Sequence, residues 1–231
     1  MRQAKAGFLD FIDDRSNIAG MNDAQPMTRR RGRPPKRADA QFDTRDALIR
    51  CGMATLTEKG FSATGIDEVL RKVGVPKGSF YHYFDSKEAF GHAVIAAYAD
   101  YFARKLDRWL LAADRPALAR IGDFVEDAAA GMARYQFRRG CLIGNLGQEM
   151  SALPESYRER LESVFRDWQA RLANCLRAAQ TEGTLAPTAD CDHWAAFFWV
   201  GWEGAVLRAR LVRSAEPLHC FTQGFFTAIG R

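Results

Sequence analysis

A turn at residues 74–76, glycine followed by valine and proline, constrains the fold of this chain more than any other feature. Glycine readily takes the left-handed conformation that ends a helix. Proline fits the first turn of a new helix, because its missing N–H would have no partner there. Ile66, Val69 and Leu70 lie at helical spacing just before the turn. The pattern predicts two short helices joined by a tight turn, with the second helix over residues 76–83.

Such a pair of helices is typical of the helix-turn-helix, in which the second helix enters the major groove of DNA. Thr64 is the expected N-cap of the first helix, with Asp67 in capping-box position. Phe80 and Phe84 should face inward and support the second helix, and Gly78 should let the backbone approach a phosphate. The side chains expected to face the groove are Lys77, Ser79, Tyr81 and His82.

Residues 1–40 form an extension in front of this region, without sustained periodicity before an alternative start at Met27. Residues 29–37 hold six positive charges, two prolines and a glycine, a composition that predicts a flexible basic arm rather than a helix. Arg31 and Arg33 belong to an Arg-Gly-Arg-Pro sequence similar to the AT-hook, whose arginines enter the minor groove of A·T-rich DNA. Non-specific phosphate binding and a solubilising tail are the alternatives.

Positive charge is concentrated in this part of the chain. Residues 28–90 contain 13 Lys and Arg against 8 Asp and Glu, an excess equal to the whole formal net charge of +5. A local basic excess on a nearly neutral chain favours a nucleic-acid partner. A solvated basic surface is the alternative.

Residues 43–58 are predicted to form a further helix, ended by Gly60. From residue 74 onward the chain reads Gly-Val-Pro-Lys-Gly-Ser-Phe-Tyr-His-Tyr-Phe-Asp-Ser-Lys-Glu, which resembles the signature of the TetR family of regulators. The resemblance implies an all-α fold, with a three-helix DNA-binding domain over residues 41–90. A larger helical domain over residues 91–231 would dimerise and hold an inducer. The family's DNA-contacting positions correspond to Thr64, Lys77, Ser79, Tyr81 and His82, and its phosphate-contacting positions to Tyr83 and Lys87.

The resemblance also implies a mechanism. A homodimer would bind a palindromic operator in double-stranded DNA, with its recognition helices about 34–36 Å apart. A small inducer would shift the helix predicted over residues 86–111 and release the DNA. Repression is the expected mode, and activation by the same scaffold is the alternative. Two other classes are a ligand-independent architectural DNA-binding protein and an enzyme acting on the ligand. No catalytic, metal-binding or phosphate-loop constellation in the sequence supports an enzyme, and no cofactor is expected.

The C-terminal part is expected to be helical. Apolar periodicity predicts helices over residues 86–111, 118–136, 156–182, 190–213 and 217–229. Between them, residues 137–150 combine small residues with the polar Asn145 and Glu149. Buried polar groups need a partner, which a bound ligand can provide.

Residues 138–150 and 199–211 resemble a subgroup of the family that senses acrylate or reactive electrophiles. This implies an inducer that is a small unsaturated acid, its thioester or another electrophile. Cys141 follows Arg138 and Arg139, whose charges would lower the thiol pKa and favour a nucleophilic thiolate, and a packing role is the alternative. The candidate ligand-binding residues are Tyr98, Phe102, Arg138, Cys141, Asn145, Glu149, Trp199, Glu203 and Arg208. The arginines expected to pair with a carboxylate inducer are Arg138, Arg139 and Arg208.

The helices over residues 156–182 and 190–213 each carry a strong apolar face. In the family such a pair meets its copy in a four-helix contact, and burial inside one protomer is the alternative for the tryptophans. The expected dimer-interface residues are Leu161, Phe165, Trp168, Leu172, Trp194, Phe198 and Trp202.

The five cysteines lack the CxxC spacing of a metal or redox site, and their number is odd, which predicts a reduced, cytoplasmic protein. No apolar run approaches the roughly 20 residues that cross a bilayer, so no membrane partner is expected. The beginning of the chain lacks the pattern of a secretory signal.

Overall fold

The computed structural model describes residues 38–230, which form helices and no strand. The all-α prediction is therefore confirmed for these residues. The extension and its basic arm, including Arg31 and Arg33, lie almost entirely outside them. The helices are α1 (Ala38–Lys59), α2 (Ile66–Val73), α3 (Lys77–Phe80), α4 (Lys87–Leu110), α5 (Ala117–Arg134), α6 (Leu142–Gln148), α7 (Ser156–Thr181), α8 (Cys191–Val212) and α9 (Glu216–Ala228).

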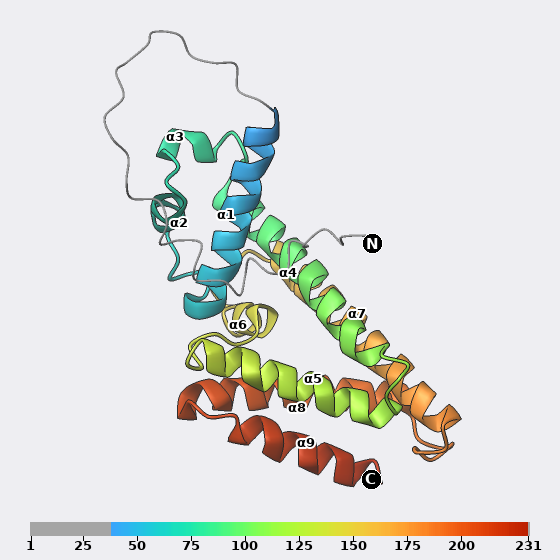
Figure 1. The fold of residues 1–231 in the computed structure, drawn as a ribbon. Helices are drawn as coiled ribbons and strands as arrows, with labels where there is room; N and C mark the ends of the chain where they lie inside the picture. The colour runs from blue at the N-terminus through green and yellow to red at the C-terminus, as the bar shows by residue number, and fades with distance from the viewer. Residues whose placement is uncertain (1–37, 231) are drawn as a thin grey trace, which may run out of the picture.

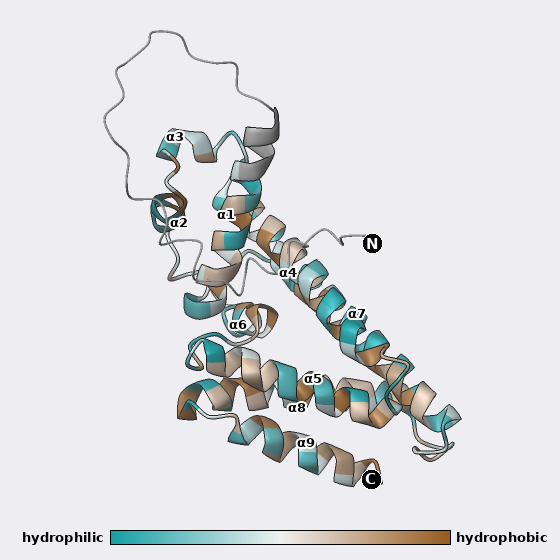
Figure 2. Cartoon of the chain, in the orientation of Figure 1, coloured by the Kyte–Doolittle hydropathy of each residue, from teal (hydrophilic) through white to brown (hydrophobic). Residues whose placement is uncertain are grey.

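The helices form two groups joined by α4 (Figure 1). Helices α1, α2 and α3 lie together at one end, and we call them the helix-turn-helix unit. Helix α4 packs on α1 at one end of its length and on α7 and α5 further along. Helix α8 packs between α7 and α9, and the short α6 lies between α1 and the rest of the C-terminal helices (Figure 1). In Figure 2, hydrophilic and hydrophobic residues alternate along α4 and α7, as expected for helices that cover a core on one side.

The turn between α2 and α3 has the predicted chemistry. Gly74 adopts φ 72° and ψ 28°, the left-handed conformation, and its N–H donates to the carbonyl oxygen of Arg71. The N–H of Val75 donates to the carbonyl oxygen of Leu70 at 3.0 Å, so the last turn of α2 is closed. Pro76 is the N-cap of α3 with φ −61°. Helix α3 itself is shorter than predicted, because after Phe80 the chain continues in turns.

Thr64 is not the N-cap of α2, and the capping-box prediction is wrong. Gly65 is the N-cap and makes no side-chain cap. The Thr64 hydroxyl donates instead to the carbonyl oxygen of Gly60 at 2.6 Å. Gly60 directly follows α1, so its carbonyl oxygen has no partner within that helix, and it takes the hydroxyl that a cap would have used. Asp67 forms an exposed ion pair with Lys77 at 3.1 Å.

The helices predicted over residues 86–111, 118–136, 156–182, 190–213 and 217–229 agree with the structure within one or two residues at each end. The helix predicted over residues 43–58 begins five residues earlier, at Ala38, so residues 38–40 belong to α1 and not to the extension. Ser86 caps α4, since its Oγ accepts a hydrogen bond from the N–H of Ala89 at 3.0 Å. Helix α6, in contrast, was not predicted, because its seven residues contain two glycines and no repeated apolar face. None of the helices in residues 38–230 is long and apolar enough to cross a membrane.

Most of the predicted dimer-interface residues lie in the core of a single protomer, so that prediction is wrong for them. Five of the seven are at most 4% exposed: Leu161, Trp168, Leu172, Phe198 and Trp202. Phe165 and Trp194 are partly buried and pack against the same core. The Trp168 and Trp199 rings lie 5.0 Å apart in the middle of the C-terminal helices. The repeat pattern identifies a buried face, but it does not reveal whether the same chain or a second copy buries it.

Helix α8 carries a second apolar face that the protomer leaves exposed. The exposed apolar residues of this face follow one another at spacings of three, seven and four residues, which places them on one side of the helix. They are Phe197, Val200, Leu207 and Leu211, which are 46%, 76%, 37% and 69% exposed. We call these four residues the outer face of α8.

Candidate DNA-binding surface and ligand cavity

Helix α3 and the turn after it form the exposed edge of the helix-turn-helix unit. Lys77, Gly78 and His82 are exposed, and Tyr81 is 58% exposed although its ring is large and apolar. Ser79 is partly buried. A Cβ atom added to Gly78 would meet nothing within 4 Å, so packing inside the protein does not require glycine there. The open space leaves room for the backbone to approach a phosphate closely.

The inward side of this edge is aromatic. Phe80 and Phe84 are buried, as predicted, and their rings lie 5.4 Å apart. Both rings also contact Phe90 near the start of α4, at 5.6 Å and 5.0 Å. This cluster fixes α3 on the first turn of α4, so a movement of α4 would carry the recognition helix with it.

Three other residues that were expected to contact DNA make contacts inside the protein instead. Thr64 is 2% exposed with its hydroxyl on Gly60, so this side chain does not reach DNA. Lys87 donates from Nζ to the carbonyl oxygen of Phe61 at 2.9 Å and lies 4.4 Å from the centre of that ring. Partial burial lowers the pKa of Lys87. A phosphate contact by Lys87 would have to replace this internal one. Tyr83 is partly buried and packs against the core.

A cavity of about 160 Å³ lies where the helix-turn-helix unit meets the C-terminal helices. Its wall combines five elements that are distant in sequence. Tyr98 and Phe102 of α4 line it, with their rings 5.8 Å apart and stacked, and Cys141 lines it at the N-cap of α6. The other lining residues are Met53, Ala54, Thr57, Tyr101, Lys105, Asp127, Ala128, Gly131, Met132, Arg134, Tyr135, Arg139, Gly140, Trp202 and Val206.

Positive charge is present on this wall, and Arg139, one of the three arginines expected to pair with a carboxylate, contributes to it. Lys105 is paired with Asp127 at 2.8 Å. The Arg139 guanidinium lies 3.8 Å from the centre of the Tyr135 ring, and its buried Nε has no hydrogen-bond partner among the described residues. The nearest carboxylate to Arg139 is that of Glu58, 3.7 Å away, which is beyond hydrogen-bonding distance. Arg139 therefore forms an ion pair with Glu58, while its Nε–H remains available to donate a hydrogen bond to a ligand carboxylate.

The structure contradicts an activated thiolate at Cys141. Burial raises the pKa of its thiol well above the usual range, and the neighbouring Glu203 carboxyl adds to this shift. Arg138 and Arg139 do not face the sulfur; both lie 3.7 Å from Glu58. The sulfur accepts a hydrogen bond from the N–H of Gly144 at 3.4 Å. The expectation that the two arginines lower this pKa is therefore wrong.

Glu203 is the unusual acid of this region. Burial raises its pKa from 4.5 to about 7, and a hydrogen bond from Cys141 opposes the shift only in part. Its Oε1 is buried with no hydrogen-bond partner among residues 38–230. A Cβ atom on Gly144 would lie 1.8 Å from Glu203 Oε2, so glycine at this position makes space for the carboxyl group.

The remaining predicted ligand residues are not on the cavity wall. Trp199 is 2% exposed in the aromatic core, and Arg208 is exposed on α8. Arg138 is about half exposed beside Glu58. Asn145 and Glu149 contact the helix-turn-helix unit instead. Met53, Ala54 and Thr57 of α1 could not be identified from the sequence as lining residues, because their helix belongs to another part of the chain. Among the described residues no group of His, Cys, Asp or Glu could hold a metal ion.

An exposed recognition helix and a cavity among the helices behind it define a class of protein, the ligand-responsive helix-turn-helix regulators. Family comparisons then place the chain within that class. Residues 48–94 match the family described as bacterial regulatory proteins, tetR family. Residues 117–225 match the tetracyclin repressor-like C-terminal domain. The chain belongs to the TetR family of transcriptional regulators, whose members bind DNA and act as dimers with small-molecule ligands.

Several relatives are similar over more than three quarters of the chain. The transcriptional regulator AcuR of Cereibacter sphaeroides is 52% identical over 87% of this chain and 91% of its own length. The repressor NemR of Escherichia coli is 31% identical over 77% of this chain and 89% of its own length. A crystal structure of a regulatory protein TetR from Rhodobacter sphaeroides is 52% identical, with a TM-score of 0.77 over 79% of this chain and 96% of that one. For the reduced form of E. coli NemR the TM-score is 0.73 and the identity 30%, over 81% of this chain and 98% of that one.

Proposed function

We propose that this regulator is a cytoplasmic homodimeric repressor that binds a palindromic operator and releases it when a small unsaturated carboxylate, such as acrylate or the acyl end of its thioester, fills the cavity. Residues 41–90 act as the DNA-binding domain and residues 91–231 as the ligand-binding and dimerisation domain. The observation that carries the proposal is the position of the cavity. Its wall includes Met53, Ala54 and Thr57 of α1, so a ligand there touches the helix-turn-helix unit itself.

The size and chemistry of the cavity support this ligand class. About 160 Å³ is similar to cavities of roughly 150 Å³ that hold a benzene molecule. A ligand of five or six non-hydrogen atoms would fit against Tyr98 and Phe102. Arg139 supplies a donor for the carboxylate or the carbonyl oxygen. Similarity to AcuR and NemR supports the same class, through the resemblance to regulators that sense acrylate or electrophiles.

Cys141 serves in this proposal as a neutral wall of the cavity. Its raised pKa keeps the thiol protonated near neutral pH, and the protonated form is a poor nucleophile. An unsaturated ligand lies next to the sulfur without needing to react with it. A Cys141→Ser variant should therefore still respond to ligand.

The test is operator binding by fluorescence anisotropy, with DNA from upstream of the gene for this protein. Acrylate, its coenzyme A thioester and propionate, the saturated analogue of acrylate, are titrated into complexes of the wild type and of Cys141→Ser. Release by acrylate and by propionate with both proteins supports a cavity that reads shape and charge. Release by unsaturated ligands alone, lost in Cys141→Ser, would show covalent sensing instead. Failure of all three ligands to release DNA would remove this inducer class.

For contact with DNA we propose Lys77, Ser79, Tyr81 and His82, which lie on the exposed edge formed by α3 and the following turn. Phosphate contacts would supply most of the affinity and these side chains the sequence preference. Tyr81→Ala should weaken binding to the operator far more than binding to unrelated DNA of equal length. Equal weakening on both would assign Tyr81 to the backbone instead of the bases.

The outer face of α8 is the proposed dimer interface. A row of large apolar side chains in water marks a protein contact, and burial in a second copy would remove Val200 and Leu211 from water. A charge at the centre of such a contact should separate the protomers. Val200→Arg should elute as a monomer in light-scattering chromatography and bind operator weakly. Leu111→Arg, at an exposed leucine away from this face, is the matched control and should remain a dimer.

A further inference from the structure

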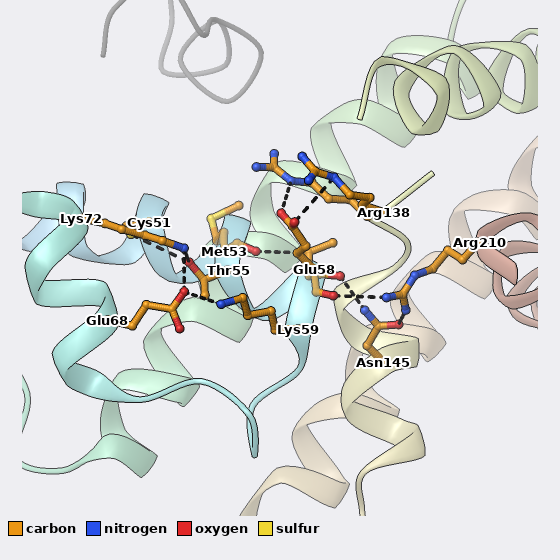
Figure 3. Close-up of polar contacts among 12 residues, drawn as sticks. Cys51, Met53, Thr55, Glu58, Lys59, Glu68, Lys72, Arg138, Asn145 and Arg210 are labelled. Carbon is orange, nitrogen blue, oxygen red and sulfur yellow. Dashed lines mark hydrogen bonds and ion pairs between the residues drawn. The ribbon is translucent and has the colours of Figure 1, made fainter. Parts of the chain in front are cut away.

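Three side chains from the C-terminal helices hold the end of α1. Asn145 of α6 donates from Nδ2 to the carbonyl oxygen of Thr57 at 2.8 Å. Arg210 of α8 donates to Asn145 Oδ1 at 2.8 Å and to the carbonyl oxygen of Glu58 at 3.2 Å (Figure 3). Glu149, just after α6, accepts from the N–H groups of Phe61 and Ser62 at 3.0 Å and 2.8 Å. We call Asn145, Glu149 and Arg210 the clasp.

The contacts of the clasp match what the end of a helix needs. The last carbonyls of α1 have no partner inside their own helix and carry partial negative charge, which suits the Asn145 amide and the Arg210 guanidinium. The N–H groups of the loop that follows face the Glu149 carboxylate. Gly60, at φ +83°, makes this approach feasible, because a Cβ atom there would lie 1.9 Å from Glu149 Oε1. The clasp therefore binds the backbone of the helix-turn-helix unit directly.

The same elements line the cavity. Cys141 is the N-cap of α6 and lies one turn before Asn145, and Val206 lies one turn before Arg210 on α8. Thr57 contributes to the cavity wall while its carbonyl oxygen accepts from Asn145. A ligand that displaces any of these wall residues therefore moves a group to which the clasp is attached.

We infer that the clasp is the positioning element that couples occupancy of the cavity to the orientation of the helix-turn-helix unit. When the clasp is closed, α1 and its following loop are held in the arrangement that binds operator. A ligand in the cavity pushes the start of α6 and the Val206 turn of α8 away from α1, and the clasp opens. This route is separate from the shift of α4 expected from the sequence. The inference rests on the proposed function for the identity of the ligand. The effect of the clasp on operator binding without ligand does not depend on it.

The experiment compares Asn145→Ala, Arg210→Met, the double variant and Arg104→Met. Arg104 is the control, an exposed arginine on α4 outside the clasp, the cavity wall and the outer face of α8. Operator affinity is measured without ligand and with saturating acrylate, and acrylate binding is measured separately by calorimetry. Hydrogen exchange follows the backbone N–H groups of residues 57–62, and circular dichroism follows the helix content.

Each single clasp variant should bind operator about tenfold more weakly without ligand, the size expected for losing a charge-assisted contact. Exchange at residues 57–62 should be faster, with unchanged helix content, and acrylate should bind more tightly to the free protein, because it no longer has to open the clasp. The ratio of operator affinities without and with acrylate should fall, and the double variant should be little worse than Arg210→Met, because both residues act through one connection. Arg104→Met should behave as the wild type.

Wild-type operator affinity and exchange in the ligand-free clasp variants would overturn the inference. So would additive losses in the double variant, because they would show two independent structural roles. If acrylate fails to release even the wild type, the proposed inducer class is wrong, whereas the ligand-free affinity and exchange still decide the role of the clasp.

Discussion

Replacement of Glu203 by glutamine tests how much the raised pKa of this carboxyl group lowers the stability of the folded protein near neutral pH. Its pKa in the folded protein is about 7, compared with 4.5 in an unperturbed chain. Between these two pH values the folded protein binds the proton and the unfolded chain does not, so stability falls as the pH rises. The contribution of the protonated Glu203 carboxyl to the free energy of unfolding is fully present below pH 4.5 and is lost as the pH rises through about 7. At roughly 1.4 kcal/mol per pH unit, the loss is about 3 kcal/mol.

Glutamine keeps the size of the side chain and cannot ionise, so Glu203→Gln should not show this loss. We expect the variant to gain about 2.5 kcal/mol relative to the wild type between pH 5 and pH 8.5, because a small part of the loss has already occurred at pH 5. The measurement is urea unfolding of both proteins at fixed protomer concentration, because the stability of a dimer depends on concentration. Glu162→Gln, in an exposed ion pair with Arg166, is the control and should stay within about 1 kcal/mol at both pH values. A difference between wild type and Glu203→Gln that does not change with pH would refute the reasoning.

Three further predictions follow from burial and packing. At pH 7.5, iodoacetamide should modify Cys141 at least tenfold more slowly than a thiol in a short peptide, since a raised pKa and burial both protect it; site-resolved mass spectrometry that finds rapid modification would contradict this. Gly91→Ala should lower stability by about 1–3 kcal/mol in urea, because its Cβ would lie 1.8 Å from the Tyr157 hydroxyl; an unchanged midpoint would show that Tyr157 moves freely. Trp168→Ala, which empties a fully buried site, should cost about 3–5 kcal/mol; a loss below 1 kcal/mol would mean that the core collapses around it.

The parts of the fold that could be predicted are those fixed by local chemistry. Gly74 and Pro76 determine the turn between α2 and α3 whatever surrounds it, and Ser86 caps α4 as its position suggests. The start of α2 could not be predicted in the same way. Thr64 has the chemistry of a cap, but the carbonyl oxygen of Gly60, one turn earlier in the chain, accepts the hydrogen bond from its hydroxyl instead.

The candidate site was less predictable because it is assembled from distant segments. Tyr98, Phe102 and Cys141 were singled out and do meet at the cavity, although their role in binding stays a prediction. Asn145 and Glu149 were also chosen, as polar groups that need partners, and they have partners in the backbone of α1 and its loop instead of a ligand. A sequence shows that a polar group must be satisfied, but it does not show what satisfies it.

Helix α8 contributes residues to the cavity wall, to the clasp and to the proposed dimer interface, because these three features lie on different sides of the helix. Val206 lines the cavity, Arg210 belongs to the clasp, and Leu207 and Leu211 belong to the outer face. These residues lie within two turns of one helix, and a helix of 22 residues moves largely as a rod. A ligand that displaces Val206 must therefore move the clasp and the proposed dimer contact together. Release of DNA would then involve a change at the contact between protomers as well as within each one.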